Sequence, residues 1–421
     1  MRVHFCIQRI NIAILRREEI MKSVIIRKNS NPGWKAPYEV TFSFKPAEDD
    51  DIAKVELTGD FQFMTQTQAD GFFRQNGTDF GITPYNPYQY SPEMFSCEFN
   101  IRKSPEHLFE MKKEEDGVYR TVLPLPDGQF HYWFILTRAD GTTEEICDPE
   151  NPSYTNEWHT YFHSRLSVGE RDKAGYEGYA FPRLDKKCGR IVFDRYKGLD
   201  GKMQCLGIYL PYGYDSSKKY PVVYVSHGGS GNELDWLNSG AMAQVFDNAI
   251  ASGEIVPVIG VTMDHGYYSI GFGQWKFEEI AQNLLKHIIP FMEEKYSAAP
   301  GAENRAFCGL SMGGMTTSYL YIHYHREFFN FGIFSGSDSV RPNEEETKIL
   351  KEGTAPYITC GCTDIAFVNP SYRTDHDITT LGLVEWLDAH DIPYVFSLKN
   401  GAHDFHIWIQ ALAEFLTKYL W

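Results

Sequence analysis

Ser311 has the sequence surroundings of a catalytic nucleophile, because it stands in a Gly-x-Ser-x-Gly pattern between Gly309 and Gly313. The residues before it predict a short buried strand over 305–310, and those after it predict a helix that runs through 316–324. A sharp strand-to-helix turn of this kind, the nucleophile elbow, holds a serine Oγ at the edge of a sheet. The glycines are needed where strand and helix pack too closely for Cβ atoms. An ordinary glycine-rich turn is the alternative interpretation, since the short pattern alone is weak.

A serine nucleophile requires a base that takes its proton and an acid that orients the base. In alternating strand–helix sheets these partners follow later strands, in the order serine, acid, histidine. Asp364 comes directly after the predicted strand 357–360, and His403 follows the predicted strand 394–398, ahead of the C-terminal helix. Each interval leaves room for strand–helix units, so we expect the three strand ends to converge.

Several other residues could take these two roles. Asp338 follows the predicted strand 331–334 and is the second candidate for the acid. His406 stands three residues past His403, and we expect it inside the helix. Asp404 points elsewhere if its loop is extended. Three further histidines are interpreted as structural or as substrate contacts: His227, His265 and His376.

Acyl transfer also requires hydrogen-bond donors for a tetrahedral oxyanion. One donor is predicted to be the backbone N–H of Met312, the residue after the serine. The second is expected from the glycine-rich run 227–231, which follows the apolar strand 222–226; Gly229 is the first choice and Gly228 the second. The run could be only a turn. A phosphate-binding P-loop is excluded because no Lys-Ser or Lys-Thr pair follows it.

Aromatic residues in loops after predicted strands are candidates for the walls of a substrate pocket, since ligands of open α/β sheets bind at these strand ends. They would suit an aromatic acyl group, although each could instead be packed in the core. The candidates are Trp236, Tyr267, Tyr268 and Trp275. Triad chemistry requires no metal or cofactor, and Cys360-Gly361-Cys362 lacks the paired spacing of a zinc site.

The elements that must position these residues are predicted over 188–421. The continuous apolar run 221–226 is typical of a strand buried on both faces. The segment 276–296 places apolar residues on one helical face. Strands and helices alternate through this region, which predicts a doubly wound α/β sheet.

The preceding part of the chain predicts a small β-sandwich over 37–152. Short segments alternate apolar and polar residues with period two and are separated by Gly/Asp turns. Residues 1–36 are predicted to be an extended lead-in and 153–187 a linker. An aromatic-rich insertion over 63–107 is interpreted as packing on the neighbouring domain or as a lid over the active site.

Length and composition are compatible with a β-sandwich domain followed by an α/β domain. A chain of 421 residues with 43% hydrophobic and 15% aromatic residues suggests two domains with large cores. Its net charge of −16 disfavours nucleic acid and anionic membranes as partners, because both bind clustered Lys and Arg. The eight scattered cysteines are interpreted as reduced thiols. A homo-oligomer is one of the assemblies that the sequence allows.

The N-terminus does not read as a signal peptide, since the apolar run 11–15 is too short and charged residues end it. Met21 is an alternative start to Met1. No apolar stretch reaches the length of a membrane span. We therefore expect a cytoplasmic protein, with secretion by another route as the alternative.

Several stretches of the second region occur together in one known family: Leu210-Pro211-Tyr212-Gly213-Tyr214, His227-Gly228-Gly229-Ser230-Gly231 with Asp235-Trp236, Gly309-Leu310-Ser311-Met312-Gly313-Gly314, Cys360-Gly361-Cys362-Thr363-Asp364 and Gly401-Ala402-His403-Asp404-Phe405-His406-Ile407-Trp408. With these motifs, residues 188–421 resemble the bacterial esterases that include feruloyl esterases and siderophore (enterobactin-type) esterases. The resemblance implies the α/β-hydrolase fold. It also places the family's triad on Ser311, Asp364 and His403.

A second resemblance concerns the predicted sandwich and rests on Leu57-Thr58-Gly59-Asp60-Phe61, Asp116-Gly117-Val118-Tyr119, Gly128-Gln129-Phe130-His131-Tyr132-Trp133-Phe134 and Cys147-Asp148-Pro149-Glu150-Asn151-Pro152. These residues are similar to immunoglobulin-like early-set modules of the carbohydrate-binding family 48 type. Such modules either dock on the catalytic domain or bind sugar.

The resemblances imply a serine esterase that releases ferulic or related hydroxycinnamic acids, as in plant cell wall polysaccharide degradation. Without a secretion signal, its expected substrates are imported feruloylated oligosaccharides or small esters. The alternatives are a siderophore esterase, which would need cationic residues near its pocket, and an acetyl esterase. A catalytically idle sugar-binding protein is the non-enzyme alternative, and an intact triad argues against it.

Overall fold

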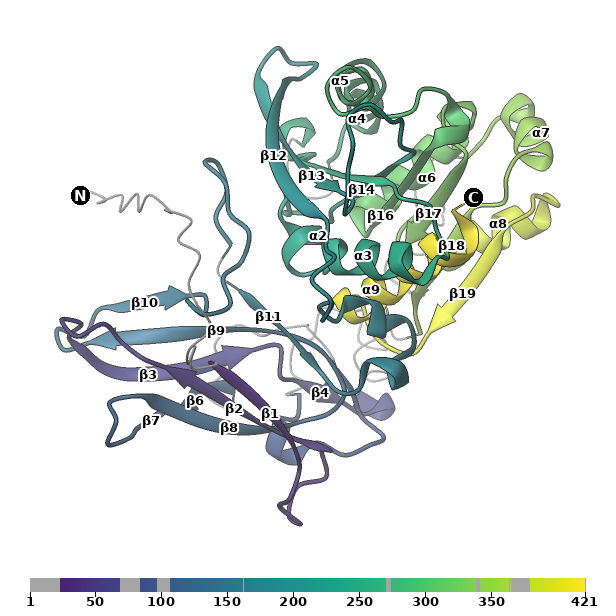
Figure 1. The fold of residues 1–421 in the computed structure, drawn as a ribbon. Helices are drawn as coiled ribbons and strands as arrows, with labels where there is room; N and C mark the ends of the chain where they lie inside the picture. Colours follow the sequence, from purple (N-terminus) through teal and green to yellow (C-terminus); the bar gives the residue numbers. More distant parts are fainter. Residues whose placement is uncertain are drawn as a thin grey trace.

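The computed structural model describes residues 23–68, 84–96, 107–161, 163–269, 274–337, 341–362, 364 and 379–420. It contains an all-β region followed by an α/β region (Figure 1). One apolar core fills the first region, and two cores lie on opposite faces of the sheet in the second. The predicted fold class is therefore confirmed.

The all-β region consists of two antiparallel sheets around one core. The first sheet has the order β1-β2-β8-β7, with strands Val24–Lys28, Tyr38–Phe44, Tyr119–Leu125 and Lys112–Lys113. The second has the order β10-β9-β3-β6 with β11 beside β9, and its strands are Thr143–Ile146, Gly128–Arg138, Ile52–Gly59, Phe109–Glu110 and Ser164–Val168. Alternate side chains of β2 point into the core. There the rings of Phe42 and Tyr132 lie 5.1 Å apart.

Two strands of this sandwich lie outside the predicted range 37–152. Strand β1 lies in the predicted lead-in and pairs with β2. Strand β11 lies in the predicted linker and pairs with β9 from Ser164 to Val168. Its alternating pattern is only five residues long and stands among charged residues, so it gives a weak strand signal. The rest of the predicted linker packs on the α/β region, where Ala180 is fully buried.

The described part of the aromatic-rich insertion packs on the sandwich core and also reaches the α/β region. It forms the two-stranded sheet of β4 (Phe63–Met64) and β5 (Phe95–Ser96). Tyr90 packs 4.9 Å from the ring of Phe63, and it lines a small cavity together with Gly401 and His406 of the α/β region. These contacts support packing on the neighbouring region. Phe72, Phe73 and Phe99 lie outside the described residues.

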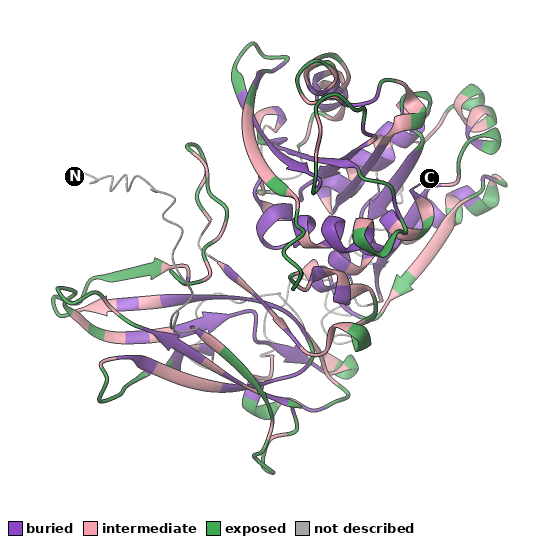
Figure 2. Cartoon of the chain, in the orientation of Figure 1, coloured by how far each residue is buried: buried purple, intermediate pink, exposed green. Residues whose placement is uncertain are grey.

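The α/β region is built on an eight-stranded sheet with the order β12-β13-β15-β14-β16-β17-β18-β19. β12 and β13 are antiparallel to their neighbours, and β15 to β19 run parallel. The strands are Arg190–Lys197, Met203–Leu210, Ile259–Met263, Val222–Ser226, Arg305–Leu310, Asn330–Phe334, Tyr357–Gly361 and Val395–Lys399. The central strands are buried along their whole length, except for Arg305 at the start of β16 (Figure 2).

Helices cover both faces of this sheet (Figure 1). One face carries α2 (Asp235–Asn238), α3 (Met242–Ser252) and α9 (Phe405–Glu414). The other carries α4 (Phe277–Asn283), α5 (Ile289–Lys295), α6 (Met312–Tyr324), α7 (Glu344–Glu352) and α8 (Thr380–Ala389). The predicted helix 276–296 is present as α4, a π-helical turn and α5, with its apolar face buried.

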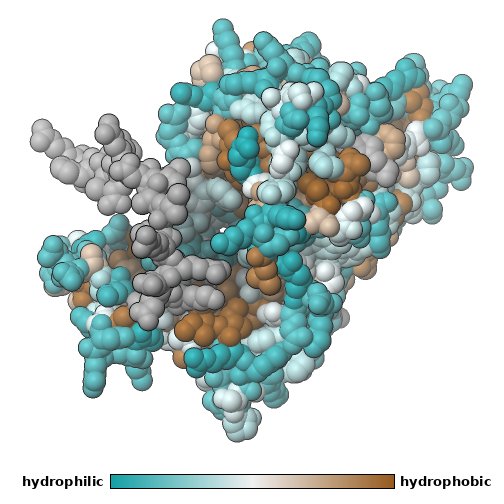
Figure 3. Space-filling view, in the orientation of Figure 1, coloured by the Kyte–Doolittle hydropathy of each residue, from teal (hydrophilic) through white to brown (hydrophobic). Residues whose placement is uncertain are grey.

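The visible surface is largely polar (Figure 3). The face drawn in Figure 3 is mainly hydrophilic, with hydrophobic residues gathered in separate patches. Within the part of the chain that the structure describes, every helix is too short or too polar to cross a bilayer.

Candidate active site

Ser311 stands at a strained turn between β16 and α6. Its backbone has φ +52° and ψ −117°, a conformation that is costly for a residue with a side chain. A Cβ atom on Gly313 would lie 2.6 Å from the carbonyl oxygens of Ser226 and His227, and one on Gly309 would lie 2.6 Å from that of Gly313. The two glycines therefore allow β14, β16 and α6 to pack in direct backbone contact, which produces the predicted elbow.

The structure brings Ser311, His403 and Asp364 into one hydrogen-bonded chain. His403 Nε2 lies 2.9 Å from Ser311 Oγ, and His403 Nδ1 lies 2.8 Å from Asp364 Oδ1. Asp364 is 1% exposed, whereas Ser311 and His403 are half-buried. The buried carboxylate accepts the proton of Nδ1, so Nε2, which faces Ser311 Oγ, can accept the proton of the serine.

Packing at the end of β18 holds the loop that carries His403. A Cβ atom on Gly361 would lie 2.3 Å from the carbonyl oxygen of Gly401, so the two backbones touch. Trp408 packs its ring edge-on to His403, with centroids 4.9 Å apart, and donates from Nε1 to Ser335 Oγ. These contacts hold the imidazole of His403 in place and set the orientation of its ring.

The other candidates for base and acid lie elsewhere. His406 lies inside α9, as expected, and its ring faces Phe130 of the all-β region at 5.7 Å. Asp404 caps α9 and accepts from the backbone N–H of Ile407. Asp338 and His376 lie outside the described residues.

The segments expected to bind an oxyanion lie beside Ser311. Met312 is the first residue of α6, so its N–H has no partner within the helix. A Cβ atom on Gly228 would lie 3.4 Å from Ser311 Cβ, which shows how closely the 227–231 loop approaches the nucleophile. His227 braces this loop: Nδ1 lies 2.6 Å from the carbonyl oxygen of Gly228, and Nε2 accepts the N–H of His265. Gly229, half-buried, follows in the same loop.

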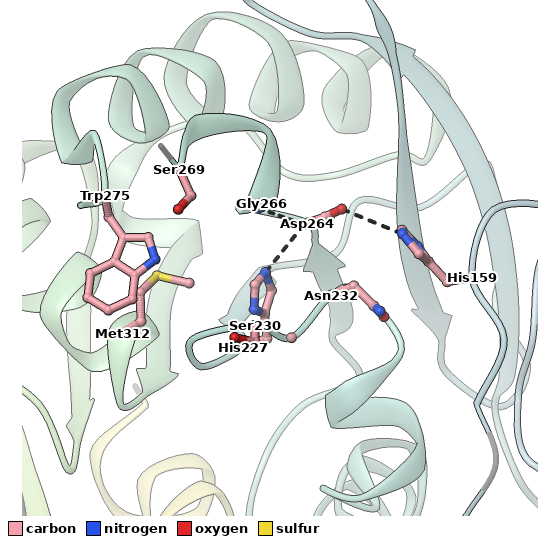
Figure 4. Close-up of a pocket in the computed structure, with 10 residues that line it drawn as sticks. His159, His227, Ser230, Asn232, Asp264, Gly266, Ser269, Trp275 and Met312 are labelled. Carbon is pink, nitrogen blue, oxygen red and sulfur yellow. Dashed lines mark hydrogen bonds and ion pairs between the residues drawn. The ribbon is translucent and has the colours of Figure 1, made fainter. Parts of the chain in front are cut away.

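A cavity of about 510 Å³ opens next to the elbow, where β14 and β15 end. Figure 4 shows Met312 and Trp275 on one side of it and Asp264 and His159 on the other. Its lining includes His159, His227, Ser230, Asp264, Trp275 and Met312. Trp275 thus has the place expected for a substrate wall.

The other three aromatic candidates are not among the lining residues. Trp236 is fully buried in the core and donates from Nε1 to the carbonyl oxygen of Ser226. Tyr268 is 5% exposed, and its hydroxyl accepts from Gln204. Tyr267 is half-buried beside it. Trp236 and Tyr268 therefore have packing roles: each ring is buried, and its polar group makes a hydrogen bond inside the protein.

The cavity is acidic. Burial raises the pKa of Asp264, and it raises that of nearby Asp235 to about 6. Burial also holds the pKa of His265 well below its usual range, so this ring is neutral. The described lining contains no lysine or arginine. The cationic residues that a siderophore esterase would need are thus missing from the described part of this cavity.

Two of the titratable lining residues were not expected from the sequence. Asp264 directly follows β15, a position equivalent to that of Asp364 after β18, and that rule could have singled it out. His159 comes from the predicted linker, and no local pattern marks it.

Comparisons with known proteins agree with this geometry. Residues 198–357 match the esterase family model, described as "Putative esterase". An endo-1,4-beta-xylanase/feruloyl esterase of Xylanibacter ruminicola is 31% identical over 60% of this chain and 34% of its own length. Endo-1,4-beta-xylanase Y of Acetivibrio thermocellus is 36% identical over 32% of this chain and 13% of its own. The chain thus spans about a third or less of these relatives.

A solved structure shares the overall fold. The enterochelin esterase of Shigella flexneri covers 94% of both chains, with a TM-score of 0.50 and 14% identity. At this identity the likeness concerns the fold alone. Together, these matches confirm the expected resemblance to esterases, and the family model and sequence relatives support a carboxylic-ester hydrolase.

Proposed function

We propose that this chain is a serine carboxylic-ester hydrolase that forms an acyl-enzyme on Ser311. The observation that carries the proposal is the hydrogen-bonded chain from Ser311 through His403 to Asp364, set on a strained elbow. The elbow lies inside the region that matches the esterase model. A buried carboxylate, an oriented imidazole and a partly exposed hydroxyl are the groups that acyl transfer requires.

In the first half of the reaction, His403 Nε2 takes the proton of Ser311 Oγ as that oxygen attacks the ester carbonyl. The carbonyl oxygen becomes an oxyanion, which accepts hydrogen bonds from the backbone N–H groups of Met312 and Gly229. Asp364 stays ionised and stabilises the imidazolium. His403 then gives its proton to the alkoxide oxygen as the bond to the alcohol breaks, which leaves the acyl group on Ser311.

In the second half, water replaces the alcohol. His403 takes a proton from the water, whose oxygen attacks the acyl carbon and forms a second oxyanion in the same place. The bond to Ser311 Oγ breaks, the serine recovers its proton from His403, and the carboxylic acid leaves. The proton transfers between Ser311 and His403 take place across the 2.9 Å contact of Oγ and Nε2.

For the acyl group we propose ferulate or a related hydroxycinnamate, esterified to a xylan-type oligosaccharide or a small alcohol. The name of the Xylanibacter relative supports this class. The flat ring of Trp275, beside Met312 in the cavity, offers an apolar face to an aromatic ring. The polar opposite wall suits the oxygen atoms of such a substrate.

The test is hydrolysis of methyl ferulate and p-nitrophenyl acetate by the wild type and by Ser311→Ala. We expect turnover of the ferulate ester and its loss by at least about 10⁴-fold in the variant, because the other triad members do not act without the serine. Turnover of the acetate alone would keep the serine mechanism and contradict the aromatic substrate. Activity that survives in Ser311→Ala would contradict the mechanism itself, provided that both proteins melt at the same temperature.

A further inference from the structure

Three side chains that the ester chemistry does not use meet at the acidic wall of the cavity. His159, Glu233 and Asp264 each offer a donor atom, and these atoms lie within 4.8 Å of one another. They come from the segment before β11, the segment before α2 and the end of β15, so the fold alone brings them together. Figure 4 shows His159 directed at Asp264 across this wall.

Only one ring nitrogen of His159 lies within hydrogen-bond distance of the carboxylates in this cluster. Its Nδ1 lies 3.0 and 3.1 Å from the two carboxylate oxygens of Glu233, so Nδ1 carries the proton. Its Nε2 faces Asp264 Oδ2 at 3.9 Å, beyond hydrogen-bond distance. A carboxylate that holds one nitrogen while the other points at a second oxygen ligand is the usual setting of a metal-binding histidine.

The distance between these two atoms suits a bridging ion. Imidazole nitrogen and carboxylate oxygen bind Zn²⁺ at about 2.0–2.2 Å, so two such ligands of one ion lie at most about 4.2 Å apart. The separation of 3.9 Å between His159 Nε2 and Asp264 Oδ2 falls inside this limit. Hence an ion fits between them with only a small movement of either side chain.

The charges at this wall favour a cation. Glu233 is fully buried and Asp264 is 9% exposed, so both carboxylates are largely removed from water. His227, which lies 3.7 Å from Asp264, accepts the N–H of His265 at Nε2 and contacts the carbonyl oxygen of Gly228 through Nδ1, so both of its ring nitrogens already have partners. One histidine therefore faces two buried carboxylates. Excess buried charge of this kind is stabilised by a metal ion.

We propose that His159 and Asp264 bind a divalent transition-metal ion of the zinc type, with Glu233 orienting the imidazole. A mixed imidazole and carboxylate set suits Zn²⁺ better than Mg²⁺ or Ca²⁺, which prefer oxygen ligands throughout. The remaining coordination positions face the cavity, where water or an oxygen atom of a bound ligand can fill them. The site is separate from the triad and does not depend on the proposed ester hydrolysis.

The test is calorimetric titration of the chelator-treated full chain with zinc chloride. We expect one strong site per chain in the wild type and at least about 10-fold weaker binding in His159→Ala and Asp264→Asn. Glu233→Gln should weaken binding about 10–100-fold, because it alters the orienting carboxylate. His323→Ala is the matched control, since it removes a histidine that pairs with one glutamate, Glu346, outside this cluster. Its affinity should equal that of the wild type.

A second measurement reports on the ligands directly and needs no activity. Cobalt(II) added in place of zinc should give visible absorption bands of a nitrogen- and oxygen-ligated ion in the wild type, and these bands should be absent from Asp264→Asn. Circular dichroism melting of each variant separates lost ligands from lost folding. The proposal is overturned if the wild type shows no saturable zinc binding, or if folded His159→Ala and Asp264→Asn bind as tightly as the wild type.

Discussion

At the scale of single residues, Asp364 gives the sharpest test of how the imidazole is held. It is buried, and its Oδ1 lies 2.8 Å from His403 Nδ1. Asp364→Asn keeps the shape but offers an amide where a carboxylate stood, so His403 loses the tautomer that accepts the serine proton. We expect kcat to fall by about 10⁴-fold with little change in melting temperature. Steady-state kinetics on the ester that the wild type prefers would measure this.

Asp391→Asn serves as the control for that variant, because its carboxylate is 94% exposed and lies on the surface after α8. It should keep the wild-type kcat. A loss below about 10-fold in Asp364→Asn would mean that His403 does not depend on this acid.

The hydrogen-bonded arrangement of Ser311, His403 and Asp364 could be predicted because each residue follows a strand, and parallel strands bring such positions to one edge of a sheet. The wall residues could not be predicted in the same way. Whether Trp236 faces a cavity or the core depends on the path of a short helix, and the structure turns it inward, toward Ser226. His159 is held at the cavity by Glu233, which is far from it in the sequence, and the residues on either side of His159 give no sign of this contact.

At the scale of elements, the elbow depends on three backbones in contact. Gly313→Ala would place a Cβ atom 2.6 Å from the carbonyl oxygens of Ser226 and His227. Since backbone cannot move aside as a side chain can, β14 and α6 must separate. We expect the variant to lose about 1–3 kcal/mol of unfolding free energy. Its activity should also fall, because the oxyanion loop begins at His227. Urea unfolding and ester kinetics would measure the two effects.

Gly353→Ala is a matched control for this substitution. Its Cβ atom would meet neighbours no closer than 3.5 Å, in backbone that other residues readily adopt. It should change the unfolding free energy by no more than about 0.5 kcal/mol. Equal effects of the two substitutions would argue against a tightly packed elbow.

Elements with a strong apolar pattern were predictable, and strands of mixed composition were not. The central strands read as apolar runs, and the helix 276–296 as one apolar face. Strands β1 and β11 are five residues long and are stabilised by pairing with β2 and β9, which the local sequence does not reveal. Strand β12 pairs along its length with β13 at the edge of the sheet. It was not predicted, because its sequence mixes charged and apolar residues.

At the scale of the whole molecule, the contact between the two regions should respond to pH. Glu177 accepts from Gln410 of α9 beside the small cavity between the regions, and loss of water around its carboxyl raises its pKa to about 7. An unfolded glutamate titrates near 4.5. Because the folded state holds this proton more tightly, its stabilising effect is present below pH 4.5 and is lost as the pH rises to about 7.

Glu177→Gln should therefore melt at a higher temperature than the wild type at pH 8, and this difference should be clearly smaller at pH 5. Scanning calorimetry at both pH values would show it. A difference that is the same at pH 5 and pH 8 would mean that the carboxyl of Glu177 does not titrate in this range.

The path of the chain between the two regions has a consequence for exchanging modules. After β10 the chain crosses to the α/β region, where Tyr154 bonds with Asn238 and His159 with Glu233. It then returns to the sandwich as β11 before it crosses again. A gene fusion joined at residue 152 would separate β11 from β9 and attach a foreign partner to a cavity wall shaped for this one. Swapped catalytic cassettes should therefore carry the entire first module, because the boundary that looks natural in the sequence cuts through shared structure.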